Sequence, residues 1–182
     1  MNKKYFLYFY VFITHIILIT LIIKFNLLNT VWNKDVSPLV EWQRTQQVMH
    51  SFNLRVDKNT SKGKVIFIGD SHIQGLAVNE VSIQGVNFGI GRDTSKIILN
   101  RIKQYQSIKS ASAVVLAFGI NAFQYRSIEE TLKNYKAILE IIPKKTLIVI
   151  NAVFNVDTAY LSIKISNKDI RTFNRKLERL SK

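Results

Sequence analysis

Short apolar runs, each bounded by a glycine or preceded by a proline, place the strongest constraint on the fold. Val65–Ile68 (VIFI) and Ala113–Phe118 (AVVLAF) are each followed directly by a glycine, and Thr146–Ile150 (TLIVI) lies just after Pro143. Continuous apolar runs of this length are typical of strands that are buried on both faces of a sheet. Helical patterns separate the runs, and this alternation predicts an α/β fold with a parallel sheet and right-handed crossovers.

Capping and spacing signals predict the helices of this α/β domain. The stretch Ser127–Glu130 (SIEE) is a capping box, so a helix is expected from there to about Ile142. Another helix is expected over about 93–105, because it begins with residues that cap helices well. A short strand over 86–88 and an amphipathic helix over 166–182 complete the pattern.

The first 24 residues have the composition of a membrane anchor. Tyr5–Ile23 is a run of 19 residues without a charged side chain, which as a helix spans about 28 Å, close to the ~30 Å hydrocarbon core of a bilayer. No small-residue cleavage motif follows the run, so an uncleaved, single-pass signal anchor over 1–24 is expected rather than a signal peptide. Lys3 and Lys4 favour a cytoplasmic amino terminus, with the rest of the chain outside the inner (cytoplasmic) membrane. The alternative is a core helix buried in protein.

Composition divides the remainder of the chain and narrows the function classes. Residues 25–62 are typical of a polar connector that includes a helix beginning near Pro38, and 63–182 form the predicted α/β domain. The net charge of +14 suits an anionic membrane surface or polymer, but the basic residues follow no nucleic-acid-binding motif, so no nucleic-acid partner is expected. The lack of cysteine excludes a disulfide framework, a cysteine-ligated metal site and a cysteine nucleophile. No metal or other cofactor is expected.

Three loops that follow predicted strands carry residues suited to chemistry. Gly69–His72 (GDSH) places Ser71 at a strand-to-helix turn, where a serine acts either as a nucleophile or as a helix cap. The stretch 87–95 (NFGIGRDTS) offers backbone N–H groups to an anion, but it lacks the third glycine of a dinucleotide fingerprint and the G-K-[ST] of a phosphate loop. In Gly119–Asn121, the Asn121 amide either donates into the same crevice or serves only the turn.

Together and in this order, the three loops resemble the motifs of the SGNH/GDSL hydrolase superfamily, in the stretches GKVIFIGDSHIQGL, VNFGIGRDTS and LAFGINAF. The second stretch also resembles the catalytic subunits of intracellular platelet-activating-factor acetylhydrolase. The resemblance covers 64 to about 151 and implies a three-layer, flavodoxin-like sandwich and chemistry through an acyl-serine. It implies that Ser71 is the nucleophile. It also implies an oxyanion hole made of the Ser71 N–H, a backbone N–H at Gly91 or Arg92, and the Asn121 amide.

The chain departs from the family pattern at several positions. Arg92 stands where the family has its donor glycine, Ala122 where it usually has Asp or Asn, and His72 where it has an aliphatic residue. Neighbouring side chains at such a turn diverge, so His72 is not expected to be the base. No histidine follows His72, so the family's Asp-x-x-His, which supplies and orients the base, has no counterpart. A domain lacking its last strand and helix is therefore expected, either as the amino-terminal piece of a longer enzyme or as a naturally truncated, inactive relative.

Three functions are compatible with these features. A membrane-anchored serine hydrolase would cleave acyl or acetyl esters through an acyl-serine. An O-acyltransferase would use the same intermediate to modify an envelope polysaccharide. A truncated, non-catalytic module of the cell envelope would bind an acylated polymer, or assist an envelope acyltransferase as its partner, without turnover.

Overall fold

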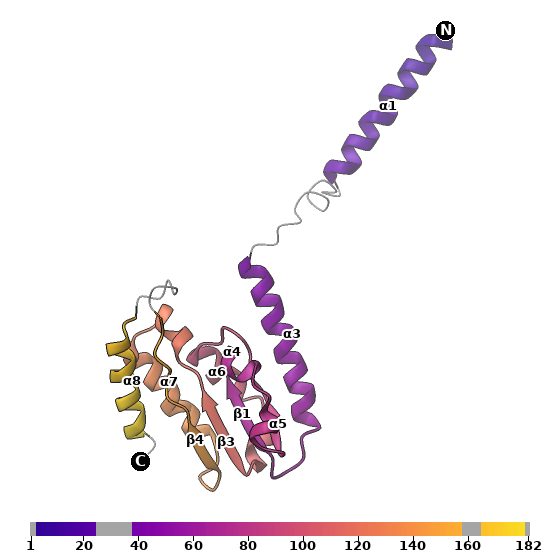
Figure 1. Ribbon diagram of the computed structural model, residues 1–182. Coiled ribbons are helices and arrows are strands. Elements are labelled where there is room, and N and C mark those ends of the chain that lie inside the picture. Colours follow the sequence, from indigo (N-terminus) through magenta and orange to yellow (C-terminus); the bar gives the residue numbers. More distant parts are fainter. Residues whose placement is uncertain (1–2, 25–37, 158–164, 181–182) are drawn as a thin grey trace. The chain divides into compact units, whose positions relative to one another are not determined.

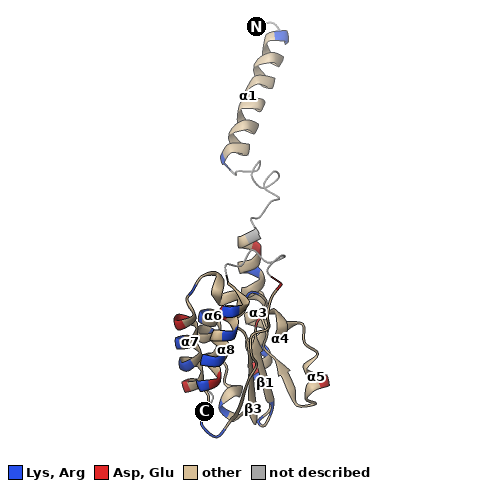
Figure 2. Ribbon diagram, turned by 60° about the vertical axis from the view of Figure 1, so that its left-hand side comes forward, with Lys and Arg blue, Asp and Glu red and all other residues tan. Residues whose placement is uncertain are grey.

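The computed structural model describes residues 3–24, 38–157 and 165–180, and the chain divides into two compact units, Met1–Arg44 and Thr45–Lys182. In the first unit, α1 (Lys3–Lys24) is a helix without buried residues (Figure 1). It is long and apolar enough to cross a membrane, by length and composition alone. Figure 2 shows charged residues only at its two ends. Helix α3 (Pro38–Lys58) contributes its residues from Thr45 onward to the second unit.

The second unit is built on a parallel sheet, which confirms the predicted fold class. Its four described strands are β1 (Val65–Gly69), β2 (Gly85–Asn87), β3 (Ala113–Ala117) and β4 (Leu147–Ile150), in the spatial order β2-β1-β3-β4. All neighbouring pairs run parallel. Strands β1, β3 and β4 are the short apolar runs of the sequence, and β2 lies at the short strand predicted over 86–88. Because all four are parallel, the loops after them meet at one edge of the sheet.

Helices cover both faces of the sheet (Figure 2). The described helices of this unit after α3 are α4 (Ser71–Gln74), α5 (Val78–Val81), α6 (Ser95–Ile102), η1 (Ser107–Ser110), η2 (Ile120–Gln124), α7 (Ile128–Ile141) and α8 (Asn167–Leu180). The predicted capping box starts α7, because the Ser127 hydroxyl accepts from the Glu130 N–H at 3.1 Å and the Glu130 carboxylate accepts from the Ser127 N–H at 3.0 Å. Helix α6 ends at Ile102, one turn before the predicted end.

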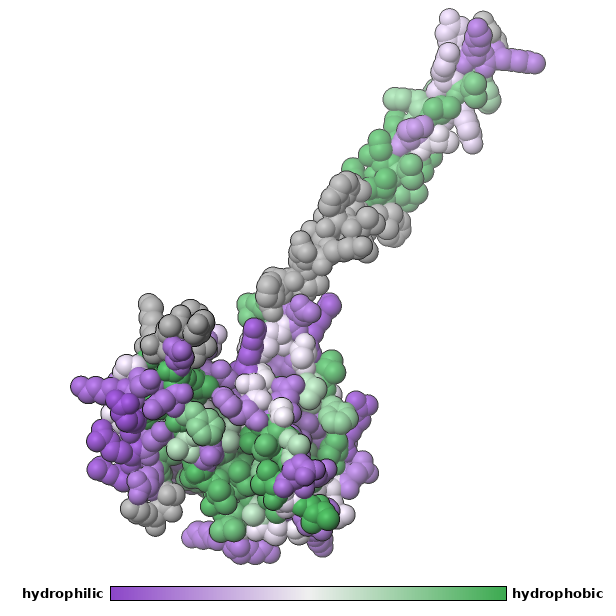
Figure 3. All heavy atoms as spheres, viewed as in Figure 1, coloured by the Kyte–Doolittle hydropathy of each residue, from purple (hydrophilic) through white to green (hydrophobic). Residues whose placement is uncertain are grey.

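The two faces of the sheet are buried to different extents. The larger apolar cluster includes fully buried strand residues that alternate along β1 and β3: Ile66, Ile68, Val114 and Leu116. Helices α6, α7 and α8 supply half of its other buried members. The smaller cluster, beneath α4 and α5, contains Phe67, Ile73, Val78 and Ala117. On this second face Leu147 and Val149 of β4 are 64% and 46% exposed, and Figure 3 shows apolar side chains at the surface there.

Candidate active site

Ser71 is the first residue of α4 and is separated from the end of β1 by Asp70 alone. Gly69 suits this turn because a Cβ at that position would overlap the carbonyl oxygen of Ala117 on β3. The Asp70 carboxylate caps α4 by accepting a hydrogen bond from the His72 N–H at 3.1 Å. Ser71 itself is exposed, and its hydroxyl makes no hydrogen bond with the described residues. The predicted nucleophile therefore lies open at the carboxyl edge of the sheet.

The glycine loop after β2 lies directly beside Ser71. A Cβ built on Gly91 would come within 3.9 Å of the Ser71 Cβ. The Gly91 N–H donates to the side-chain oxygen of Gln74, so Gln74 occupies this predicted oxyanion donor. Arg92 has a φ of 62°, the left-handed conformation that glycine adopts most easily, and its N–H makes no hydrogen bond with the described residues. Of the two positions considered for the predicted backbone donor, Arg92 is the one whose N–H has no partner in the described part of the chain.

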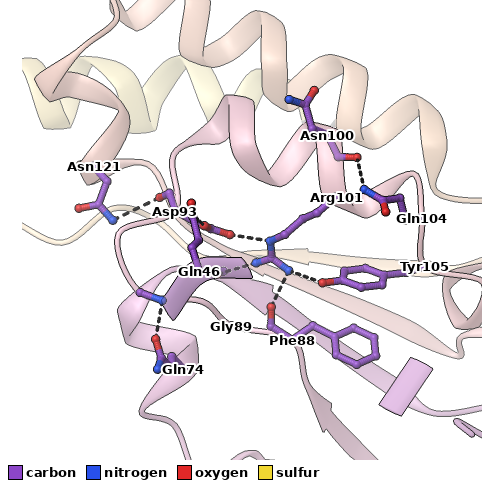
Figure 4. A network of polar contacts seen from close by, with 12 residues as sticks. Gln46, Gln74, Phe88, Gly89, Asp93, Asn100, Arg101, Gln104, Tyr105 and Asn121 are labelled. Carbon is purple, nitrogen blue, oxygen red and sulfur yellow. Dashed lines mark hydrogen bonds and ion pairs between the residues drawn. The ribbon is translucent and has the colours of Figure 1, made fainter. Parts of the chain in front are cut away.

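Asn121 connects the third loop to the second. It lies in η2, after a turn in which Gly119 has a φ of 146°. Its amide nitrogen donates to the carbonyl oxygen of Asp93 at 3.2 Å (Figure 4). An amide nitrogen carries two N–H groups, so this contact orients the amide and leaves its second N–H without a partner among the described residues. The structure thus brings the second and third predicted loops into contact.

A buried arginine of α6 lies beneath these loops. Arg101 is 1% exposed, and its Nε donates to the Asp93 carboxylate at 2.5 Å (Figure 4). Its Nη2 donates to the carbonyl oxygen of Gly69 at 2.9 Å, and its Nη1 to that of Phe88 at 2.7 Å. Nη1 also donates to the Tyr105 hydroxyl at 2.9 Å. The Arg101 side chain therefore contacts the end of β1, the residue that follows β2, and Asp93 of the second loop.

The Asp93 carboxylate is held from two directions. One oxygen accepts from Arg101, and the other accepts from the Gln46 amide of α3 at 2.6 Å. Burial raises the pKa of the Asp93 carboxyl above its usual value, while the neighbouring Arg101 acts in the opposite direction. A buried ion pair is tolerated only when its hydrogen bonds are also satisfied, and here both carboxylate oxygens have donors.

A cavity of about 80 Å³ lies at the ends of β3 and β4 and is lined by Asp70 and His72, the two chain neighbours of Ser71. Its walls are mostly apolar, with Asp70 and His72 at one side and the segment 151–156 at the other. His72 Nδ1 lies 3.0 Å from one Asp70 oxygen, and its ring lies 5.9 Å from that of Phe154. The second Asp70 oxygen is buried and has no partner among the described residues. The His72 ring therefore faces this cavity, whereas Ser71 lies next to the β2 side.

Comparison with solved structures identifies this arrangement of sheet and loops. A Streptococcus pneumoniae protein, provisionally described as a platelet activating factor, matches with a TM-score of 0.70 at 20% identity over 78% of this chain and 72% of that chain. A GDSL-like lipase from Bacteroides thetaiotaomicron matches with a TM-score of 0.61 at 17% identity over 71% of each chain. A lipase/acylhydrolase from Enterococcus faecalis matches with a TM-score of 0.57 at 17% identity over 65% of this chain and 72% of that chain.

The chain has an SGNH/GDSL hydrolase-like fold. The predicted resemblance is confirmed at the level of the fold, which is all that identities of this size show. Neither a family model nor a curated protein matches the sequence. In the part of the chain that the structure describes, no group of three His, Asp or Glu side chains is placed to hold a metal ion.

Sequence reasoning missed the polar residues that support the loops of this candidate site. The sequence marks Asp93 only as a capping residue at the start of the helix expected over about 93–105, and it does not distinguish Arg101. One signal was available: Arg101 lies between the inward-facing Ile98 and Ile102 on α6, so helical spacing places it beside the buried face. Gln74 gave no comparable signal, because its bond to Gly91 depends on how two loops meet.

Proposed function

We propose that the protein is a serine acyl hydrolase in which Ser71 is the nucleophile. The observation that carries the proposal is an exposed serine at the start of α4, next to loops in which the Arg92 N–H and one N–H of the Asn121 amide have no partner among the described residues. The Ser71 Oγ attacks the carbonyl carbon of an ester, the alcohol leaves with a proton, and water then releases the acid from the acyl-serine. Each donor that meets the developing negative charge on the carbonyl oxygen is worth about 10²–10³ in rate.

The cavity lined by Asp70 and His72, the chain neighbours of Ser71, supports a small acyl group as the preferred substituent. A cavity of about 150 Å³ holds a benzene molecule, so a cavity of about 80 Å³ accommodates roughly half as many atoms, as in an acetyl group. Its apolar walls suit a methyl group better than a charged one. We therefore propose a short-chain ester as the substrate.

The proposed location of the reaction is based on the first unit. The length and composition of α1 support an anchor in the cytoplasmic membrane, and the lysines at its start support a domain outside the cytoplasm. An acetylated envelope polymer is then the substrate within reach. If a polysaccharide hydroxyl replaces water in the second step, the same acyl-serine makes the protein an O-acyltransferase.

Labelling with a fluorophosphonate tests the proposed nucleophile. The Ser71 oxygen displaces fluoride from phosphorus, and the added mass is read on the intact full-length chain in detergent. Wild-type protein is expected to take one label and Ser71→Ala none, while Ser51→Ala, at an exposed serine of α3, labels like wild type. Added imidazole is expected to accelerate labelling, because no imidazole of the described residues bonds to the Ser71 hydroxyl. A folded wild-type chain that stays unlabelled with and without imidazole excludes the hydrolase.

A second candidate function is binding without turnover. The observation in its favour is that the His72 ring, next to Ser71 in the sequence, pairs with Asp70 instead of the serine. A binding module retains an acetylated polysaccharide equally well with Ser71 or with Ser71→Ala and releases no acetate. Release of acetate that depends on Ser71 decides for the hydrolase.

A further inference from the structure

Arg101 contacts structural elements that belong to separate parts of the candidate site. The carbonyl of Gly69 ends β1, two residues before Ser71. The carbonyl of Phe88 belongs to the residue just after β2, directly before Gly89 of the glycine loop. The Asp93 carboxylate belongs to the end of that loop. Figure 4 shows the guanidinium between the Asp93 carboxylate and the Phe88 carbonyl.

The third loop joins the same assembly through the backbone. Asn121 donates to the carbonyl oxygen of Asp93, so the position of its amide depends on where Asp93 lies. Gln46 of α3 fixes the Asp93 carboxylate from the other side at 2.6 Å. None of these contacts reaches the exposed serine directly, so the arginine has no part in bond making.

We propose that Arg101 is the positioning residue of the candidate oxyanion site, and this inference rests on the proposed acyl-serine chemistry. Through Gly69 it sets the start of the turn that carries Ser71. Through Phe88 and Asp93 it sets both ends of the loop that presents the Arg92 N–H, and through Asp93 it also sets the Asn121 amide.

The shape of the guanidinium explains why an arginine is required at this position. Its planar group presents five N–H donors in a fixed geometry, and Arg101 uses Nε, Nη1 and Nη2 toward different acceptors. A lysine ammonium is a single point on a flexible stem and reaches only some of them. Misplacement of a reacting group by about 1 Å is enough to cost roughly 10² in rate.

Labelling kinetics on the full-length chain separate positioning from a general contribution to stability. The maximal labelling rate constant and the half-saturating probe concentration are measured with a fluorophosphonate at one fixed imidazole concentration. Arg101→Lys is expected to lower the rate constant by about 10²-fold and to leave the half-saturating concentration within a factor of about three, because donors to the oxyanion act in the transition state. Ile138→Ala, at a fully buried residue of α7, is a destabilised control expected to keep the wild-type rate constant while it is folded.

Each outcome decides one question. Loss of rate in folded Arg101→Lys, with Ile138→Ala unaffected, supports positioning. A wild-type rate constant in folded Arg101→Lys overturns the inference while the hydrolase proposal stands, and an unlabelled wild-type chain removes the hydrolase proposal itself. If circular dichroism shows that Arg101→Lys does not fold, Asp93→Asn takes its place, because it keeps the side-chain volume and leaves the Gly69 and Phe88 acceptors in place. The same rate criterion then applies.

Discussion

The two sides of Ser71 differ in how their buried polar groups are satisfied. On the β2 side, Asp93 and Arg101 are 0% and 1% exposed, and both oxygens of the carboxylate accept hydrogen bonds. On the β3–β4 side, a buried oxygen of Asp70 has no partner among the described residues, and Phe154 is 61% exposed at the wall of the cavity. The β2 side has the features of a rigid support, and the β3–β4 side those of a surface that contacts another molecule.

The buried Asp70 oxygen without a partner among the described residues carries a free-energy cost. A buried donor or acceptor without a partner costs about 1–3 kcal/mol, and native proteins contain few of them. The β2 side avoids that cost because Asp93 accepts hydrogen bonds from Gln46 of α3 and Arg101 of α6, and Arg101 also donates to Gly69 at the end of β1. The Asp70 oxygen bears it at the cavity, where a bound group with an N–H or O–H would remove it.

The largest effect is expected from breaking the buried pair on the β2 side. Asp93→Ala leaves the Arg101 guanidinium buried without its counter-charge, and removal of one partner of such a pair costs about 3–5 kcal/mol. The free energy of unfolding is measured by urea titration of the full-length chain in detergent. Glu140→Ala removes an exposed carboxylate on α7 and is expected to change stability by less than about 0.5 kcal/mol. A loss below about 1 kcal/mol in Asp93→Ala would show that water satisfies Arg101 and that this side is not the rigid one.

The next effect concerns the rate of labelling. Asn121→Ala removes an amide donor, so the maximal rate constant of fluorophosphonate labelling is expected to fall by about 10²–10³. The stability cost is only about 1 kcal/mol, because a single neutral hydrogen bond to Asp93 is lost. Asn134→Ala is the matched control: its amide bonds to the Ser95 hydroxyl at 2.9 Å. Equal rates in the two variants would remove Asn121 from the oxyanion hole.

The sequence was sufficient to predict the parts of the fold that depend on local patterns. The continuous apolar runs gave β1, β3 and β4, and the Ser127 capping box gave the start of α7, because burial on both faces and capping are encoded within a few residues. The position of Ser71 followed from the same logic. Its role is still a prediction.

The supporting network could not be predicted, because its contacts join distant positions. Arg101 meets Gly69 across 32 residues, and Gln46 meets Asp93 across 47. No local pattern specifies such pairs, since they depend on how α3 and α6 pack at the strand ends. The conformation of Arg92 is a second example: the sequence shows a bulky residue where the family has glycine, and only the structure shows that its φ stays positive.

A smaller effect is expected on the cavity side. Phe154→Ala removes an exposed ring that lies 5.9 Å from His72, so it is expected to change stability by less than about 0.5 kcal/mol. With an ethyl fluorophosphonate, the half-saturating concentration should rise a few-fold while the maximal rate constant stays the same, as for a group that binds ground and transition states equally. Phe52→Ala, at a half-exposed ring of α3 outside the cavity, should change neither value. A fall in the rate constant alone would place Phe154 with the supporting residues.

The smallest effect is a pH dependence that belongs to the β2 side. His50 of α3 stacks on Tyr105 at 6.0 Å, and burial together with the nearby Arg101 lowers its pKa below the usual 6.5. In the unfolded chain His50 binds its proton first as the pH falls through 6.5, so the unfolded state gains protons that the folded state does not take up until its lower pKa is reached. The free energy of unfolding is therefore expected to fall from pH 8 to pH 5 more steeply in wild type than in His50→Gln. Asp93 acts in the opposite direction, because a raised carboxyl pKa favours the folded state as the pH falls. The difference between the two proteins isolates His50, and parallel curves would show that its ring is solvated like a surface histidine.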